Sequence, residues 1–274
     1  MRSSIRTHLV TYIKHLQADW SRSQPLSHWM LDAQRFARML RLSSNGANGE
    51  VAALSFPPHP LYLYRELLES LQANNSCVFR NLSDHVQQIL PDPQRINIVL
   101  RHDVDAGEPA VVRALCEIEE SLGLRSAVHI LVDGELYDPM PLVSLACQLH
   151  DTGFDVGLHT QAWMKEAYAA AFDQELRQFE SIFGFAPKTF TLHGAWPRTA
   201  QDQARRRQFT QELSRLIAEK SLLGYNNRFD WVSEDSNIQG QPTPISARFF
   251  QIAEGCYLGG VALLLTHDNH WQAA

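Results

Sequence analysis

The chain has 274 residues, of which 45% are hydrophobic, 20% charged and 9% aromatic. This globular composition supplies enough apolar material for a substantial core, so it excludes a disordered, collagen-like or disulfide-stapled chain. The formal net charge of −6 argues against a general nucleic-acid binder, because such proteins are usually basic.

Residues 1–60 are predicted to form an N-terminal helical extension. Segments 5–17 and 26–42 have the apolar periodicity of helices, and the loop-forming sequence SSNGANG follows at 43–49. The proline-rich stretch 57–60 ends this part, in which no chemistry is recognisable. Capping of the following domain and a homodimer contact are both open as roles for the extension.

Strands and helices alternate over residues 61–274. Short apolar strands are predicted at 96–100, 127–132, 155–158, 189–192 and 261–266. Helices are predicted at 62–72, 109–122, 141–150, 173–183 and 199–220. This alternation predicts an α/β domain with a mostly parallel sheet, either open or closed into a barrel.

The cysteines and the hydropathy pattern bear on the compartment. The four cysteines are far apart in the sequence and are expected to be free thiols in a reducing environment. No segment approaches the roughly 18 apolar residues that span a bilayer, and the first 19 residues lack the apolar core of a signal peptide. We therefore expect a cytoplasmic protein without a membrane span.

Four predicted strands run directly into histidine or aspartate. Strand 96–100 leads into the sequence RHDVD, and the others lead into His159, His193 and His267. Because the carboxyl ends of parallel strands converge on one rim, where active sites are built, these side chains are expected to meet there. Carboxylate and imidazole groups can bind a catalytic metal ion and can transfer protons.

These residues resemble the polysaccharide deacetylase-like family, also called the NodB-homology family or carbohydrate esterase family 4. The segment Arg101-His102-Asp103-Val104-Asp105 is identical to the first motif of one branch of that family. The sequence GFDVGLH at 153–159 is similar to the family strand GHEIGLH. Shorter similarities follow in the family order at 192–194, 229–236 and 265–267, so the resemblance covers roughly residues 60–272.

The resemblance implies a distorted (β/α) barrel of NodB-homology type, commonly with seven strands. It also implies a divalent metal ion that serves the hydrolysis of acetamido groups on sugars. Zinc is the metal that we expect, and cobalt, nickel and manganese could use the same ligands. Carried over by position, Asp103 is the general base, His267 the general acid, and Asp105 and His159 are metal ligands.

Two positions depart from the family pattern. The family has a second ligand histidine four residues after the first, and Trp163 occupies that position here. The usual pair of adjacent aspartates is split by Val104, which leaves open which aspartate binds the metal. We expect His193, in the His-Gly element of this branch, to replace the missing ligand. Otherwise the metal site is incomplete.

Further polar residues are assigned by their place near the rim. Asp268 or another carboxylate is expected to orient the imidazole of His267. His129 lies in an apolar stretch and is expected to line the core, and His270 is a weaker candidate for the rim. The candidates for substrate contact are Arg101, Trp196, Arg198 and Asp235.

The leading hypothesis is a metal-dependent deacetylase of an N-acetylated sugar from a surface polysaccharide pathway. One alternative keeps the metal and hydrolyses another linear C–N amide bond at the same rim. The other alternative is a non-catalytic barrel that binds a glycan or a partner protein, and the presence of Trp163 motivates it. Neither nucleic acid nor membrane is expected as a partner.

Overall fold

The computed structural model describes residues 58–194, 199–220, 229–235 and 256–272. They belong to one compact unit that spans Ser55–Ala274. The helices predicted within the first 57 residues lie outside the described residues, as do Trp196 and Arg198.

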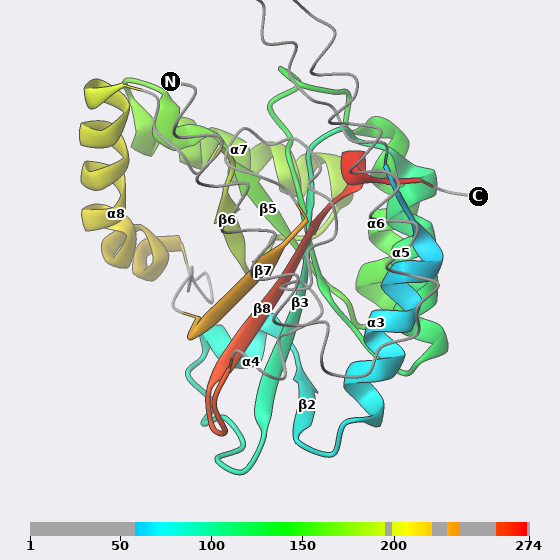
Figure 1. Ribbon diagram of the computed structural model, residues 1–274. Coiled ribbons are helices and arrows are strands. Elements are labelled where there is room, and N and C mark those ends of the chain that lie inside the picture. The colour runs from blue at the N-terminus through cyan, green and yellow to red at the C-terminus, as the bar shows by residue number, and fades with distance from the viewer. Residues whose placement is uncertain (1–57, 195–198, 221–228, 236–255, 273–274) are drawn as a thin grey trace, which may run out of the picture. The chain divides into compact units, whose positions relative to one another are not determined.

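A parallel sheet of seven strands forms the centre of this unit (Figure 1). The strand order is β6-β5-β4-β3-β8-β7, and β2 also pairs with β3. Among the described residues β6 and β7 are not paired with each other, so the curled sheet is open there. The strands are β2 (Cys77–Arg80), β3 (Ile96–Val104), β4 (Ala127–Ile130), β5 (Asp155–Thr160), β6 (Phe190–Leu192), β7 (Trp231–Glu234) and β8 (Val261–His267).

Apart from α4, the described helices occur where the sequence predicts them; one begins five residues early, at Tyr168, and the other ends shift by one or two residues. Pro109 opens its helix at the first turn, where a missing N–H costs nothing. Gly184 ends another with a left-handed φ of 79°, the conformation that favours glycine. The helices are α3 (Leu61–Ala73), α4 (Leu82–Val86), α5 (Pro109–Ser121), α6 (Val143–Asp151), α7 (Tyr168–Phe183) and α8 (Ala200–Lys220). Together with the parallel sheet, they confirm the α/β prediction.

Short elements connect the sheet to its surroundings. Single turns of 3₁₀ helix occur at η1 (Met140–Leu142), η2 (Ala162–Met164) and η3 (Asp268–His270). A separate two-stranded parallel sheet pairs β1 (His59–Pro60) with β9 (Trp271–Gln272). The sequence predicted neither this small sheet nor β2 and α4, because strands of two to four residues carry too few positions to show a period.

Strand β3 differs most from its predicted length. It continues through Arg101, His102 and Asp103 to Val104, whereas the apolar run ends at Leu100. The polar half remains a strand because both neighbours pair with it: Asp103 lies opposite His129 of β4 and His267 of β8. Arg101, His102 and Asp103 are therefore buried inside the sheet, and only Asp105 of the RHDVD sequence follows the strand.

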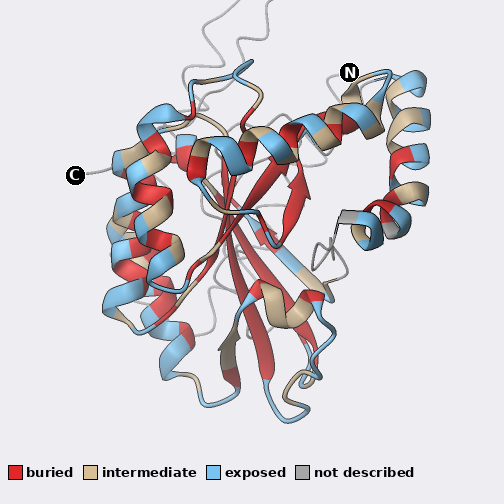
Figure 2. Cartoon of the chain, turned by 180° about the vertical axis from the view of Figure 1, so that it is seen from behind, coloured by how far each residue is buried: buried red, intermediate tan, exposed pale blue. Residues whose placement is uncertain are grey.

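The strands of the sheet are mostly buried (Figure 2), and apolar side chains fill the space between the sheet and the helices. One cluster joins β5 and β6 to α7 and α8 through Phe172, Phe179, Phe190 and Phe209. A second joins β3 and β8 to α3 and α5, and it includes Tyr64. Burying one such large side chain contributes about 1.5–3 kcal/mol, so these clusters hold the strands at fixed spacing.

All four cysteines lie in described residues and are free thiols, as the sequence predicts. In the described part of the chain, no helix combines the length and the apolar character that crossing a bilayer requires.

Candidate metal centre and its acid–base groups

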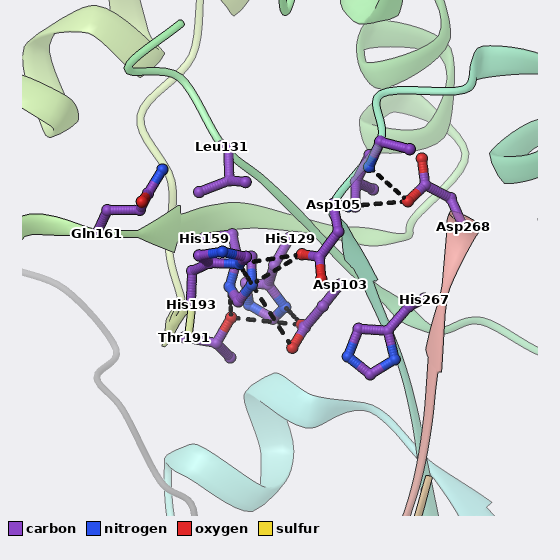
Figure 3. Close-up of polar contacts among 12 residues, drawn as sticks. Asp103, Asp105, His129, Leu131, His159, Gln161, Thr191, His193, His267 and Asp268 are labelled. Atoms are coloured by element: carbon purple, nitrogen blue, oxygen red, sulfur yellow. Dashed lines mark hydrogen bonds and ion pairs between the residues drawn. The ribbon is translucent and has the colours of Figure 1, made fainter. Parts of the chain in front are cut away.

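Asp105, His159 and His193, here called the ligand trio, come together at the carboxyl ends of β3, β5 and β6 (Figure 3). His193 Nδ1 lies 3.1 Å from Asp105 Oδ1. His159 Nε2 lies 3.4 Å from that oxygen and 3.2 Å from His193 Nδ1. The structure thus brings together the three residues that the sequence predicted as metal ligands.

The donor atoms of the ligand trio fit a divalent cation. Thr191 Oγ1 lies 2.8 Å from His159 Nδ1, and a hydrogen bond there leaves Nε2 free to face Asp105. Burial would raise the pKa of Asp105, but the hydrogen bonds and charges of the neighbouring imidazoles outweigh it and lower the pKa well below its usual value. Two imidazole nitrogens and an ionised oxygen at such distances repel unless a proton or a cation lies between them. Two imidazoles and one carboxylate are a common zinc ligand set.

Strand pairing explains how distant residues reach one site. Asp103 and Asp105 lie two positions apart, so both project from the same side of the chain. His129 of β4 lies between β3 and β5, and Gly157 of β5 makes room for its ring. A Cβ at Gly157 would lie 2.7 Å from the His129 ring and 2.6 Å from the Thr189 carbonyl oxygen. Glycine at this position is therefore a packing requirement.

Asp103 lies beside the ligand trio as a buried, ionised carboxylate. Arg101 Nη2 donates to its Oδ2 at 2.8 Å, and that oxygen lies 3.9 Å from His159 Nε2. Burial would raise the pKa of Asp103, but the charge of Arg101 and the nearby imidazoles outweigh it and bring the pKa to about 2. Arg101, predicted to contact substrate, is itself only 7% exposed and pairs with Asp103.

His129 is fully buried, as the sequence predicts, and lies 4.0 Å from Asp103. Its Nε2 hydrogen-bonds Thr189 Oγ1 at 3.1 Å. Burial lowers the pKa of His129 to about 3, so the ring is neutral at physiological pH. It lies beside Asp103 without adding charge.

His267 projects from β8 beside Asp103, and its Nδ1–H donates to Asp235 Oδ1 at 2.7 Å. Asp235 also accepts hydrogen bonds from the His267 backbone N–H at 2.9 Å, from Trp271 Nε1 at 2.6 Å and from His270 Nδ1 at 3.0 Å. Burial would lower the pKa of His267, but the negative charge and hydrogen bond of Asp235 raise it to about 9. His267 is therefore a cation at neutral pH.

The two carboxylates on this side have different roles from those expected. Asp235, a candidate for substrate contact, is 1% exposed and is the carboxylate that orients His267. Asp268, the named candidate for that task, accepts the backbone N–H groups of Asp105, Ala106 and Glu108 at 2.8–2.9 Å. It therefore fixes the turn that carries Asp105.

Sequence reasoning missed several supporting residues. Thr191 stands two positions before His193, a spacing that in a strand places both on one face, and this signal could have identified it. Trp271 gave no comparable signal, and His270 was only a weaker candidate for the rim, because the contact of both with Asp235 depends on η3, which follows β8.

No family model matches the sequence, and no curated protein matches it. Several solved structures are similar in fold. The catalytic domain of a peptidoglycan N-acetylglucosamine deacetylase from Eubacterium rectale has 14% identity and a TM-score of 0.46, over 62% of this chain and 76% of that chain. A polysaccharide deacetylase from Bacillus cereus has 16% identity and a TM-score of 0.41, over 64% and 81%.

A third similar structure is a mutant of a CE4 family pseudoenzyme with restored enzymatic activity. It has 13% identity and a TM-score of 0.41, over 63% of this chain and 57% of that chain. At such identities the likeness concerns the fold alone. The assignment to the RHDVD branch stays a prediction.

Proposed function

We propose that this chain is a metal-dependent deacetylase that hydrolyses the acetamido group of an N-acetylated sugar. The observation that carries the proposal is the ligand trio beside an ionised Asp103, which in turn lies next to a protonated His267. Titratable groups whose pKa values are driven apart within one site are typical of an acid–base pair. A surface polysaccharide pathway and a cytoplasmic location are part of the same proposal.

Asp105, His159 and His193 would hold the metal ion, with zinc as the metal that this ligand set favours. When bound, a divalent cation polarises a carbonyl group and makes hydroxide available near neutral pH. The hydroxyl of Thr191 holds the His159 ring in the orientation that this ligation needs. The turn anchored by Asp268 does the same for Asp105.

Asp103 would accept the proton of the attacking water. Its Oδ2 lies 3.9 Å from His159 Nε2, so it borders the space that the ligand trio encloses. Arg101 keeps the carboxylate ionised over the physiological pH range, which means that the acceptor is available in every molecule. In this proposal Arg101 acts through Asp103, and Trp196 and Arg198 remain the candidates for substrate contact.

His267 would donate a proton to the leaving amine, which is too basic to depart as an anion. Asp235 occupies Nδ1 of the ring, so Nε2 is the nitrogen that remains to donate. The pKa of about 9 keeps the ring protonated at neutral pH before each turnover. The proton that Asp103 removes and the proton that His267 supplies then balance over the reaction.

The proposal is tested with oligomers of an N-acetylated hexosamine, by measuring released acetate. Asp103→Asn is expected to lower the rate by about 10²–10⁴-fold, the usual contribution of a general base. Its metal content should match that of the unchanged protein. Asp151→Asn is the matched control, because Asp151 is exposed at the end of α6, just before the opposite end of β5. Full activity of Asp103→Asn would exclude the assigned base.

The same experiment separates the two alternatives. Turnover of simple amides without turnover of N-acetylated sugars would favour hydrolysis of another C–N bond. Binding of glycan with neither metal nor turnover would favour the non-catalytic barrel. The measured metal content of Asp105→Ala, His159→Ala and His193→Ala should fall in all three, from about one ion per chain, if these residues form the site.

A further inference from the structure

Trp163 occupies the position where the resemblance leads one to expect a histidine ligand, and the structure gives it a different contact. It lies in η2, directly after β5, and its side chain is 2% exposed. The indole Nε1–H donates to the backbone carbonyl oxygen of His193 at 2.8 Å. The residue at the substituted position therefore touches the backbone of the residue proposed to replace the missing ligand.

His193 needs such a contact because it lies beyond the end of its strand. Strand β6 ends at Leu192, so the sheet supplies one further bond only, from the His193 N–H to the carbonyl oxygen of Thr160 at 2.9 Å. The carbonyl of His193 is bonded by Trp163. Both backbone polar groups of His193 are thus held by the segment between Thr160 and Trp163, which directly follows His159.

The residue after His193 explains why the hydrogen bond from Trp163 to the His193 carbonyl matters. Gly194 has a φ of 63°, a conformation that glycine adopts without strain. A Cβ there would lie 2.3 Å from the terminal methyl of Met164, a flexible end that can move aside, so it is the backbone conformation that favours glycine. Because glycine permits the preceding peptide group to rotate easily, a donor to the His193 carbonyl is needed to fix that peptide group.

The Trp163 ring is itself held firmly. It belongs to the apolar cluster under α7 and α8, together with Phe172 and Phe209. The guanidinium group of Arg206, on α8, lies 5.9 Å from the ring centroid, within the range of a cation–π interaction. A rigid indole can transmit its position to the carbonyl that it contacts.

We propose that Trp163 is a positioning residue, whose indole N–H places the His193 imidazole against His159 and Asp105. The inference rests on the proposed metal site. At the position where the family has a second ligand histidine, this chain has Trp163, and the N–H of Trp163 fixes the replacement ligand His193. The same residue had motivated the non-catalytic alternative.

The test is Co²⁺ binding to the full chain, measured by competition with a chelator and by the visible absorption of the bound ion. Trp163→Phe keeps an aromatic ring and removes the N–H. It is expected to weaken Co²⁺ binding by about 10–100-fold, the usual effect of losing a group that orients a ligand. The absorption spectrum should change as well, because a displaced imidazole alters the ligand geometry.

Trp231→Phe is the matched control. Trp231 lies on β7 opposite Ala262, which is five positions before His267 and near the other end of β8, and its ring packs in the second apolar cluster. This variant should bind Co²⁺ with unchanged affinity and spectrum. Unchanged binding by Trp163→Phe as well would overturn the inference and leave the metal site standing. Absence of Co²⁺ binding by the unchanged protein would overturn both proposals.

A second variant, which changes a single group of the Trp163 ring, tests the inference if Trp163→Phe does not fold. Benzothienylalanine in place of Trp163 keeps the two-ring shape and replaces the N–H by sulfur, so packing is preserved. We expect weaker Co²⁺ binding and a changed spectrum here too. Binding equal to that of the unchanged protein would show that the ring fills space and that its N–H positions nothing.

Discussion

Three groups of side chains in the described residues are close enough to hold a metal ion, and their hydrogen bonding differs sharply. In the ligand trio, neither a backbone N–H nor a hydroxyl of the described chain donates to the atoms that face one another. Asp235, by contrast, accepts four hydrogen bonds, from the His267 backbone and from the side chains of His267, His270 and Trp271. Proximity alone does not distinguish these groups, whereas donors other than the imidazoles do.

The third group, His102, Cys116 and Glu119, resembles the Asp235 group. Glu119 Oε1 lies 2.9 Å from His102 Nε2 and accepts the hydroxyl of Tyr64 at 2.5 Å. A carboxylate that already receives protons from its neighbours has no need of a cation. This comparison favours the ligand trio as the metal site and assigns the other two groups to support of the strands.

The largest expected effect separates catalysis from metal binding. His267→Gln removes the proposed acid and should lower acetate release by about 10²–10⁴-fold. Co²⁺ affinity should remain unchanged, because His267 is not in the ligand trio. His193→Gln should instead lower both. Loss of Co²⁺ binding in His267→Gln would show that the two sides of the site share one metal.

The next effect concerns stability. Asp235→Asn leaves the protonated His267 buried without its counter-charge, and breaking a buried pair in this way typically costs about 3–5 kcal/mol. The free energy of unfolding in urea at pH 7 measures the loss. Asp105→Asn in metal-free protein is the comparison, because an amide can donate to an imidazole nitrogen. Its expected loss is smaller, because no backbone or indole N–H loses its acceptor there. Equal losses would mean that the two carboxylates are bonded alike.

The ion pair of His267 with Asp235 predicts that the free energy of unfolding depends on pH. The pKa of His267 is about 9 in the folded protein, against 6.5 for an unperturbed histidine. A group whose pKa is raised on folding stabilises fully below its unfolded pKa, and this contribution disappears as the pH rises through the folded value. Unfolding free energy should therefore fall between pH 6.5 and 9, by up to about 3 kcal/mol from this residue.

Asp235→Asn should flatten that slope, since it removes the charge that raises the pKa of His267. Urea titrations at several pH values between 6.5 and 9 provide the measurement. His129 does not interfere, because its lowered pKa of about 3 makes it act on the acid side of this window. A slope that is identical in both proteins would contradict the assigned pairing.

The sequence predicted most of the fold and the members of the site, because both depend on local signals. Apolar runs located β3, β4, β5, β6 and β8, and a His or Asp after four of these strands predicted the convergence. The alternation of strands with helices was enough to predict that the sheet is parallel. The extent of β3 was underestimated, since a polar RHD segment remains a strand only when neighbours on both sides pair with it.

The roles within the site were harder to predict because they depend on contacts between distant segments. Asp235 lies 32 positions before His267, and nothing local shows that its side chain is turned inward. Trp163 and His193 are 30 positions apart. Residue type predicts the chemistry that a side chain can perform, whereas the partner that it finds is decided by how the strands and the 3₁₀ turns pack.

The smallest predicted effect tests how the ligand trio is oriented without removing any member. Thr191→Val keeps the shape of the side chain and removes the hydroxyl that bonds His159 Nδ1 at 2.8 Å and, more weakly, donates to Asp103 Oδ1 at 3.4 Å. Co²⁺ binding should weaken by about tenfold, since the ring loses the contact that fixes its tautomer. Thr189→Val is the control: its hydroxyl bonds His129, which lies outside the trio. Equal affinities in both variants would mean that the sheet alone orients His159. A loss confined to Thr191→Val would show that the hydrogen bond at Nδ1 of His159 orients Nε2 of the same ring for metal binding.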